Sequence, residues 1–283
     1  MLVCFVGYGQ SATIYTHQKV VNWQNWKDDF TISLLLATDE SINEQKAYFL
    51  KNELQGLFDV LDRKKMKYTS DQKLLAAVFA ELFDSHLHNY KALTTFTKTM
   101  EQKEFDCLTG TLLFALSLEK LGFQYAIHET NNHVYLTVQT SEGEVLIETT
   151  DRKFGLEKNK HLIAKRRKEY QRQYEQAKEN TKNAFTSFFK IERQIDLTEL
   201  IGLQYFNKAV NAYNQKSYEQ SINFLKQSIQ LYDAERSTEL MVLSIKQYLQ
   251  MPTLQSDKKE KLLQYEDFYV HKLAAKLSSS KTF

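Results

Sequence analysis

The stretch from residue 105 to residue 151 constrains the fold most, because its hydrophobic period changes at one glycine. Before Gly122, four leucines recur at helical spacing, and Asp106 stands ahead of them as a candidate N-cap. After Gly122, apolar and polar residues alternate as they do in half-buried strands. The alternating runs cover residues 123–129, 133–139 and 144–150, and the leucines are Leu112, Leu113, Leu116 and Leu118. The stretch therefore predicts a helix that ends at Leu121-Gly122, then a strand and a hairpin.

Three reactive side chains lie at the ends of these predicted elements. Cys107 falls in the first turn of the helix, where the positive end of the helix dipole favours a thiolate. His133 opens the second strand, and an imidazolium beside the sulfur would stabilise that thiolate further. Glu148 lies near the end of the third strand, where a carboxylate would orient the imidazole. The backbone N–H of Cys107 has no intrahelical acceptor and offers an oxyanion donor. Together these residues favour thiol-based acyl transfer.

The order of these elements resembles that of the bacterial transglutaminase-like superfamily, which carries a papain-like triad of cysteine, histidine and acid. The matching segments are residues 106–111 at the cysteine, 121–123 after the helix, 132–135 at the histidine and 146–150 at the acid. The resemblance implies an α+β domain with helices against a small antiparallel sheet. It also implies that Cys107, His133 and Glu148 are catalytic, in a chemistry that needs neither metal nor organic cofactor.

The identity of the acid has two interpretations. Members of the superfamily usually carry Asp-Pro-Thr where this chain has Glu148-Thr149-Thr150. A simple hairpin that turns at Glu142-Gly143 would place Asp151, rather than Glu148, beside His133, unless a glycine bulge shifts the register. The motif favours Glu148, and Asp151 stays open as the alternative.

Each of the three side chains also has an ordinary structural interpretation. Cysteine is often a small buried apolar residue, and a histidine in a strand usually fills a structural role. Glu148 fits the polar face of a strand. Their order, and their positions at three element ends, favour a thiol site over three unrelated structural roles. Redox sensing by Cys107 is a weaker hypothesis, because no resolving cysteine lies nearby in the sequence.

Composition excludes several classes of function. The 283 residues carry a net charge of +2, which is too small to indicate nucleic-acid binding. The chain has no glycine-rich phosphate loop and no metal-spaced set of histidines or cysteines, so we expect no cofactor and no metal. Cys4 and Cys107 are the two cysteines, and they make no disulfide framework. No apolar run approaches the roughly 18 residues that span a bilayer.

Residues 1–20 are interpreted either as a signal-peptide remnant or as an N-terminal arm. Met1 to Ala12 is a short apolar run that ends in small and polar residues, like the end of a secretory signal, but it lacks a positive start. A buried first strand explains the run equally well. If it is a signal remnant, the protein is exported to the periplasm or cell envelope; otherwise it is cytoplasmic.

Residues 21–155 make up the expected transglutaminase-like domain. Apolar spacing predicts helices at 42–61, 69–82 and 93–100, all before Cys107. His86 and His88 do not share a helix face, so we interpret them as helix-end or packing residues rather than as a metal pair. Tyr90 is interpreted as a core tyrosine, in preference to a cleft residue that assists the oxyanion.

Residues 156–190 are predicted to form a basic helical connector. The segment 157–182 holds nine Lys or Arg residues against four Glu residues. A basic run of this kind is usually a solvated helix face or a linker, and binding to an anionic surface is the minority interpretation.

Residues 191–283 are predicted to form an all-α domain. Asp196 and Glu199 have the spacing of a capping box at the start of a helical region from Ile195 to Asp233. Within it, AYNQKSYEQSINFLKQSIQLYD resembles the helix–turn–helix of the tetratricopeptide repeat (TPR), with serines at two small positions. Further helices are predicted at 236–250 and 259–276, with Pro252 at the break. The resemblance implies a peptide or protein partner; a structural role, packed on neighbouring helices, is slightly favoured.

The leading functional hypothesis is a thiol-dependent amide-bond hydrolase or acyl transferase, that is, a peptidase, amidase or transamidase. It would act on a peptide or protein amide through a thioester of Cys107. The alternative is a catalytically inactive transglutaminase-like and TPR-like scaffold that binds a protein partner.

Overall fold

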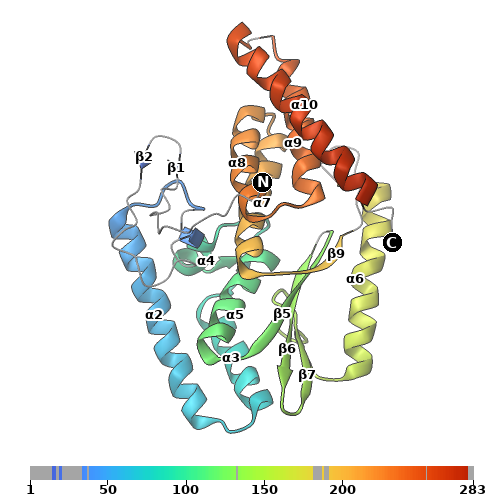
Figure 1. The fold of residues 1–283 in the computed structure, drawn as a ribbon. Helices are drawn as coiled ribbons and strands as arrows, with labels where there is room; N and C mark the ends of the chain where they lie inside the picture. Colours follow the sequence, from blue (N-terminus) through green and yellow to red (C-terminus); the bar gives the residue numbers. More distant parts are fainter. Residues whose placement is uncertain are drawn as a thin grey trace, which may run out of the picture.

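The fold is an α+β arrangement in which helices flank a small antiparallel sheet and further helices stand at one end of it (Figure 1). The computed structural model describes residues 34–36, 38–131, 133–180, 187, 191–252 and 254–279, and the backbone of two short strands, β1 (Tyr15–Thr16) and β2 (Lys19–Val20). For residues 171–180 and 279 it describes the backbone. The predicted α+β class is confirmed. The signal-peptide interpretation of Met1–Ala12 and the residue Cys4 lie outside the described residues.

Three helices precede Cys107, as the sequence predicts: α2 (Glu44–Lys67), α3 (Asp71–Ser85) and α4 (Phe96–Gln102). The side chain of Ser70 caps α3 by accepting a hydrogen bond from the backbone N–H of Lys73. Two short strands, β3 (Asn89–Tyr90) and β4 (Glu104–Phe105), then pair in parallel and lead the chain into the helix that carries Cys107.

The two histidines after α3 are helix-end residues, as predicted. His86 is the C-cap of α3 and is buried, and its Nδ1 lies 2.6 Å from Ser85 Oγ. His88 is exposed, and its Nε2 lies 2.9 Å from the backbone oxygen of Asp84. Neither ring reaches the residues predicted for the thiol site.

Cys107 is the first residue of α5 (Cys107–Leu121), and both ends of this helix are as predicted. Asp106 Oδ1 accepts from the backbone N–H of Thr109 at 2.8 Å, and Thr109 Oγ1 accepts from the backbone N–H of Asp106 at 3.0 Å. These reciprocal bonds are a capping box, which fixes the angle at which the chain enters the helix. Gly122 ends the helix with a φ of 79°, a conformation that glycine adopts without steric cost.

The sheet has five strands in the order β8-β7-β6-β5-β9. They are β5 (Gln124–Thr130), β6 (Val134–Thr140), β7 (Gly143–Ile147), β8 (Leu156–Glu157) and β9 (Glu192–Ile195). The β6–β7 hairpin pairs Thr140 with Gly143 and Leu136 with Ile147. Gly143 has a φ of 123°, so the tight connection depends on a residue without a Cβ.

The third predicted strand is shorter than its apolar alternation suggests. β7 ends at Ile147 rather than at residue 150, because the chain turns immediately afterwards. The backbone N–H of Glu148 donates to Gly155 O at 2.7 Å, and the N–H of Gly155 donates to Asp151 O at 2.7 Å. A Cβ on Gly155 would lie 2.2 Å from Glu148 O, so the turn also requires glycine. Glu148 is therefore the first residue of the turn that follows β7.

Different helices cover the two faces of the sheet (Figure 1). On one face, Leu136, Val138 and Ile147 join the large core that also contains the buried side chains of α5. On the other face, Tyr135 and Leu146 pack against Ile163 and Tyr170 of α6 (Lys160–Asn180). The sheet is therefore an internal layer between α5 and α6.

The basic segment is helical, as predicted, but α6 does more than connect two parts of the chain. Arg166 Nη2 lies 3.2 Å from Asp151 Oδ2, and Arg167 Nη2 lies 2.9 Å from Glu144 Oε1. These pairs hold α6 against β7 and the turn after it. One side of the basic helix thus covers the sheet while the other faces solvent.

After β9 the described residues form four helices: α7 (Leu197–Asn214), α8 (Tyr218–Leu231), α9 (Glu235–Leu249) and α10 (Ser256–Ser279). The predicted capping box at Asp196 and Glu199 is present, with bonds of 2.7 Å and 3.0 Å. Ile195, predicted to open the helical region, is instead the last residue of β9, which pairs with β5. The first residues of the helical half therefore complete the sheet.

The helices of this half pack as successive antiparallel neighbours, and α7 also packs on α5. Ser221 is fully buried, and its hydroxyl donates to the backbone oxygen of Ala209 at 2.9 Å, which joins α8 to α7. A Cβ on Gly202 would lie 2.6 Å from Tyr232 Cβ, so α7 approaches the end of α8 closely. One continuous core therefore runs from α2 through the sheet to α9.

Among the described helices, none is both long and apolar enough to span a membrane.

Candidate active site

Cys107 lies at the mouth of a cavity rather than inside the core. Its side chain is partly exposed, while the residues on either side of it, Asp106 and Leu108, are buried. Because it is the first residue of α5, its backbone N–H has no acceptor within the helix. The thiol thus stands at the positive end of a helix that the capping box holds in place.

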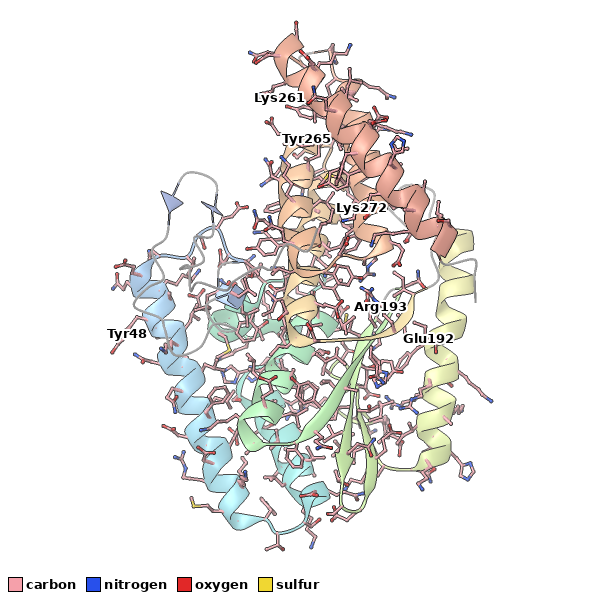
Figure 2. The ribbon with its side chains drawn as sticks, in the orientation of Figure 1. Tyr48, Glu192, Arg193, Lys261, Tyr265 and Lys272 are labelled. Carbon is pink, nitrogen blue, oxygen red and sulfur yellow. The ribbon has the colours of Figure 1, made fainter. Side chains whose placement is uncertain are left out.

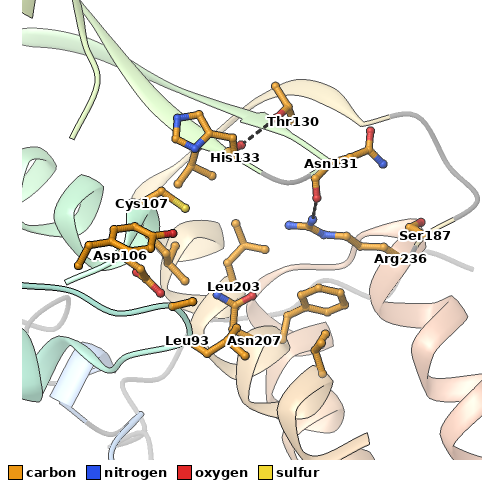
Figure 3. A pocket seen from close by; sticks show the side chains of 16 residues that line it. Leu93, Asp106, Cys107, Thr130, Asn131, His133, Ser187, Leu203, Asn207 and Arg236 are labelled. Carbon is orange, nitrogen blue, oxygen red and sulfur yellow. Dashed lines mark hydrogen bonds between the residues drawn. The ribbon is translucent and has the colours of Figure 1, made fainter. Parts of the chain in front are cut away.

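His133 immediately precedes β6 and faces Cys107 (Figure 3). Its backbone oxygen accepts from the N–H of Thr130 at 2.8 Å, which closes the short turn between β5 and β6. Its Nε2 lies 2.5 Å from Glu148 Oε2, so the other ring nitrogen, Nδ1, is the one left to face the sulfur. The imidazole is therefore held between a sulfur and a carboxylate.

Glu148 is the acid that the structure brings to His133. Its Oε2 accepts from His133 and from Tyr170 Oη, at 2.5 Å and 2.6 Å. Its Oε1 accepts from the backbone N–H of Thr150 at 2.9 Å and from the Thr150 hydroxyl at 2.6 Å. A buried carboxylate with four donors is satisfied and fixed in orientation.

The hairpin register explains why this residue is Glu148. The β6–β7 pairs place Leu146 opposite Thr137, and side chains on one face recur every second residue. Continued past Ile147, the register puts Glu148 opposite Tyr135, on the same face as His133 and diagonal to it. Two residues, Ser141 and Glu142, connect the strands, one fewer than in the simple hairpin that would place Asp151 beside His133.

Asp151 has a different role. Its Oδ1 accepts from the backbone N–H groups of Lys153 and Phe154, at 3.2 Å and 2.8 Å, and its Oδ2 pairs with Arg166. It stabilises the turn after β7 and contacts α6. The alternative in which Asp151 is the partner of His133 is therefore wrong.

The pair of His133 and Glu148 is ionised. Burial lowers the pKa of His133, but its interactions with Cys107 and Glu148 outweigh burial and raise it to about 10. Burial raises the pKa of Glu148, but hydrogen bonds from His133, Thr150 and Tyr170 outweigh burial and lower it to about 2. The ring that faces the sulfur is therefore an imidazolium at neutral pH.

Tyr170 is a site residue that the sequence interpretation missed. Its ring lies 5.0 Å from the ring of His133, and its hydroxyl donates to Glu148. Burial, followed by the charge of Glu148, raises the pKa of Tyr170, so it remains a neutral donor. The available signal was helical spacing: Ile163 and Tyr170 are apolar residues two turns apart within the basic run.

The first turn of α5, which begins at Cys107, lies in close contact with the turn that contains Glu148. A Cβ on Gly110 would lie 2.9 Å from Thr149 Oγ1, and that hydroxyl donates to the backbone oxygen of Cys107 at 3.3 Å. Thr149 is fully buried. A glycine in the first turn of α5 therefore allows this helix and the turn after β7 to touch.

Cys107 and His133 line a cavity of about 260 Å³ (Figure 3). Tyr90 lines the same cavity and is 60% exposed, with its ring edge-on to Phe105 at 5.9 Å. The interpretation of Tyr90 as a core residue is wrong: it stands at the cavity, because β3 brings it beside the start of α5. The opposite wall includes Arg236 and side chains of α7.

No group of three or more His, Cys, Asp or Glu side chains within the described ranges is arranged to hold a metal ion. Comparisons with protein-family models, with curated proteins and with solved structures found no match. The functional conclusion therefore rests on the geometry of this chain.

Proposed function

We propose that this protein is a thiol-dependent amide-bond hydrolase or acyl transferase. Cys107 is the nucleophile, His133 the general acid and base, and Glu148 the residue that orients the imidazole. We also propose that residues 21–155 adopt a transglutaminase-like fold and that the helices after β9 are TPR-like. The observation that carries the proposal is one imidazole that faces a partly exposed thiol and bonds to a buried carboxylate, beside a cavity.

In the first half of the reaction, the Cys107 thiolate attacks the carbonyl carbon of a bound amide and forms an S–C bond. The carbonyl electrons move to oxygen, and the proposed donors to that oxyanion are the N–H of Cys107, at the start of α5, and the hydroxyl of Tyr90, which lines the cavity. As the C–N bond breaks, His133 gives its proton to the leaving amine. A thioester on Cys107 and a neutral His133 remain.

In the second half, neutral His133 removes a proton from water or from an acceptor amine as that molecule attacks the thioester. The C–S bond breaks, the electrons return to sulfur, and the thiolate–imidazolium pair is restored. Glu148 keeps its charge throughout and holds the ring in one orientation. Attack by water gives hydrolysis, and attack by an amine gives acyl transfer.

The direct test of acyl transfer uses p-nitrophenyl acetate, an activated ester that requires no specific recognition. The proposal predicts an acetyl thioester on Cys107, detected by intact mass and peptide mapping, together with a stoichiometric burst of p-nitrophenolate. The reaction is then run with and without an alkylamine in the buffer. An acetylated alkylamine as product shows transfer, and acetate shows hydrolysis. All measurements use protein that carries Cys4→Ser, so that any thioester forms on Cys107.

His133→Ala should slow acylation by about 10²-fold or more, the usual contribution of a positioned acid–base group. Acetylation confined to surface lysines, or acylation of Cys107 no faster than that of a free cysteine peptide, would instead support the scaffold hypothesis.

A further inference from the structure

The cavity beside Cys107 is built by both halves of the chain. Cys107 and His133 come from α5 and the sheet, whereas Leu203 and Phe206 come from α7, and Arg236 comes from α9 (Figure 3). The helical half therefore supplies the wall opposite the nucleophile. A substrate that reaches Cys107 contacts both halves at once.

Arg236 is the charged group of that wall. Its side chain is 9% exposed. Its Nε donates to Tyr232 Oη at 2.8 Å, its Nη1 donates to Asn131 O at 3.0 Å, and its Nη2 lies 2.5 Å from Glu129 Oε1. A guanidinium has five N–H groups. These three bonds leave one N–H on Nη1 and one on Nη2 with no acceptor among the described residues.

Buried and half-buried charged groups of both signs lie near Arg236. Glu129 is fully buried and is shared by two guanidinium groups, because Arg193 Nε donates to its other oxygen at 2.8 Å. Figure 2 shows Arg193 on β9, where the sheet meets the helical half. Glu239, one turn after Arg236, accepts from the Ser187 hydroxyl at 2.7 Å. The cavity wall thus carries a guanidinium that shares its carboxylate with a second guanidinium.

We propose that Arg236 binds a carboxylate of the substrate while Cys107 attacks the amide. The two remaining N–H groups form the donor pair that a carboxylate accepts from arginine. The substrate is therefore an acyl compound with an acidic group, such as a peptide whose acidic side chain or terminal carboxylate enters the cavity. Leu203 and Phe206 of α7 contact the apolar part between the amide and the carboxylate. This inference rests on the proposed function, because it assigns the substrate of the same site.

The test uses pairs of alkylating reagents that differ only in charge. N-iodoacetyl-glycine and N-iodoacetyl-4-aminobutyrate carry a carboxylate at two spacer lengths, and their primary amides are the neutral partners. In each case Cys107 displaces iodide and forms a C–S bond. The rate of each reagent with Cys107 is divided by its rate with glutathione, which removes differences in intrinsic reactivity.

For one spacer length at least, the carboxylate should label Cys107 about tenfold faster than its amide, the effect of one charge-assisted hydrogen-bonded contact. Arg236→Gln should abolish this preference, so that the carboxylate and its amide label Cys107 at equal rates. Arg63→Gln removes the same charge from the exposed face of α2 and should leave the preference intact. Arg236→Lys should retain part of it, because a lysine keeps the charge without the paired donors.

The outcomes separate the two proposals. Equal rates for the carboxylate and the amide in the native protein, with rapid labelling by iodoacetamide, would overturn the role of Arg236 and leave the thiol site standing. Slow labelling by every reagent would overturn both proposals. If circular dichroism shows that Arg236→Gln does not fold, Arg236→Lys decides, because it keeps the charges of the site and removes only the paired donors; a preference for the carboxylate undiminished in Arg236→Lys would overturn the role of Arg236.

Discussion

The hydroxyl of Tyr170 lies 2.6 Å from Glu148 Oε2, the same oxygen that bonds His133. Tyr170 lies on α6, in a part of the chain that sequence analysis assigned to a connector. Its ring also packs against His133, at 5.0 Å between ring centroids. The helix on the outer face of the sheet therefore completes the support of the proposed acid–base residue.

Tyr170→Phe should raise the pKa of Glu148, because one of the hydrogen bonds that lower that pKa is lost. The phenyl ring still packs on His133, so the imidazole stays in place. The acidic limb of the rate of acylation by p-nitrophenyl acetate should move to higher pH. The free energy of unfolding should fall by about 2 kcal/mol at neutral pH, the usual value of a hydrogen bond to a charged group.

Tyr48→Phe is the matched control, because Tyr48 lies on α2 and is 65% exposed. An acidic limb at the same pH in Tyr170→Phe and in the native protein would contradict a positioning role for the hydroxyl.

Glu148→Gln and Asp151→Asn should separate the two acids that the sequence left open. Glu148→Gln removes the charge beside His133 and should slow acylation of Cys107 by about 10²-fold or more. Asp151→Asn should leave the rate within about twofold and lower the free energy of unfolding by about 1 kcal/mol, because its bonds belong to the turn. The reverse order of the two rates would contradict the geometry.

Gly110→Ala should destabilise the protein by about 1–3 kcal/mol, because the new Cβ meets Thr149 Oγ1 at 2.9 Å. Gly56→Ala is the same change in α2, where nothing lies within 4 Å of the new Cβ, and it should stabilise by about 0.5–1 kcal/mol. Chemical denaturation measures both. A loss of stability of equal size at the two glycines would show that helix backbone effects, and not the contact with Thr149, determine the cost.

The contribution of the ion pair to stability should depend on pH. The pKa of His133 is raised from 6.5 to about 10, so its contribution is complete below pH 6.5 and is lost as pH rises toward 10. The pKa of Glu148 is lowered from 4.5 to about 2, so its contribution is complete above pH 4.5 and is lost as pH falls toward 2.

His133→Gln should therefore cost about 3 kcal/mol of unfolding free energy at pH 5.5, where both contributions are complete, and less at pH 9. Urea denaturation of both proteins at the two pH values measures the difference. A cost that is the same at both values, or larger at pH 9, would contradict the charged pair.

Local signals predicted much of the fold. Asp106, Ser70 and Gly122 mark helix ends through their own chemistry, so they are read correctly without tertiary information. The end of β7 was not predicted, because the apolar alternation continues to residue 150 while Gly155 folds the backbone back onto Glu148. β9 was missed because its four residues gain their pairing only from β5.

Site residues at the ends of predicted helices and strands could be predicted from the sequence. Site residues carried by helices from elsewhere in the chain could not. Cys107 and His133 follow from the order of helix and strands, whereas Glu148 was favoured by the motif, because a simple hairpin would have placed Asp151 beside His133. Tyr170 and Arg236 reach the site through the packing of α6 and α9. Helical spacing marks Tyr170 as part of an apolar face, but no local pattern shows that this face packs at the site. Tyr90 was placed in the core because an aromatic residue after an apolar helix usually lies there.

The central assertion is that His133 activates Cys107, and the pH dependence of iodoacetamide labelling in a Cys4→Ser background tests it most directly. We predict rapid alkylation of Cys107 at pH 6, well below the free-thiol value of about 8.5, and a profile in His133→Ala that returns to that of an ordinary thiol. Native and His133→Ala proteins with the same profile, rising only near pH 8.5, would contradict the account.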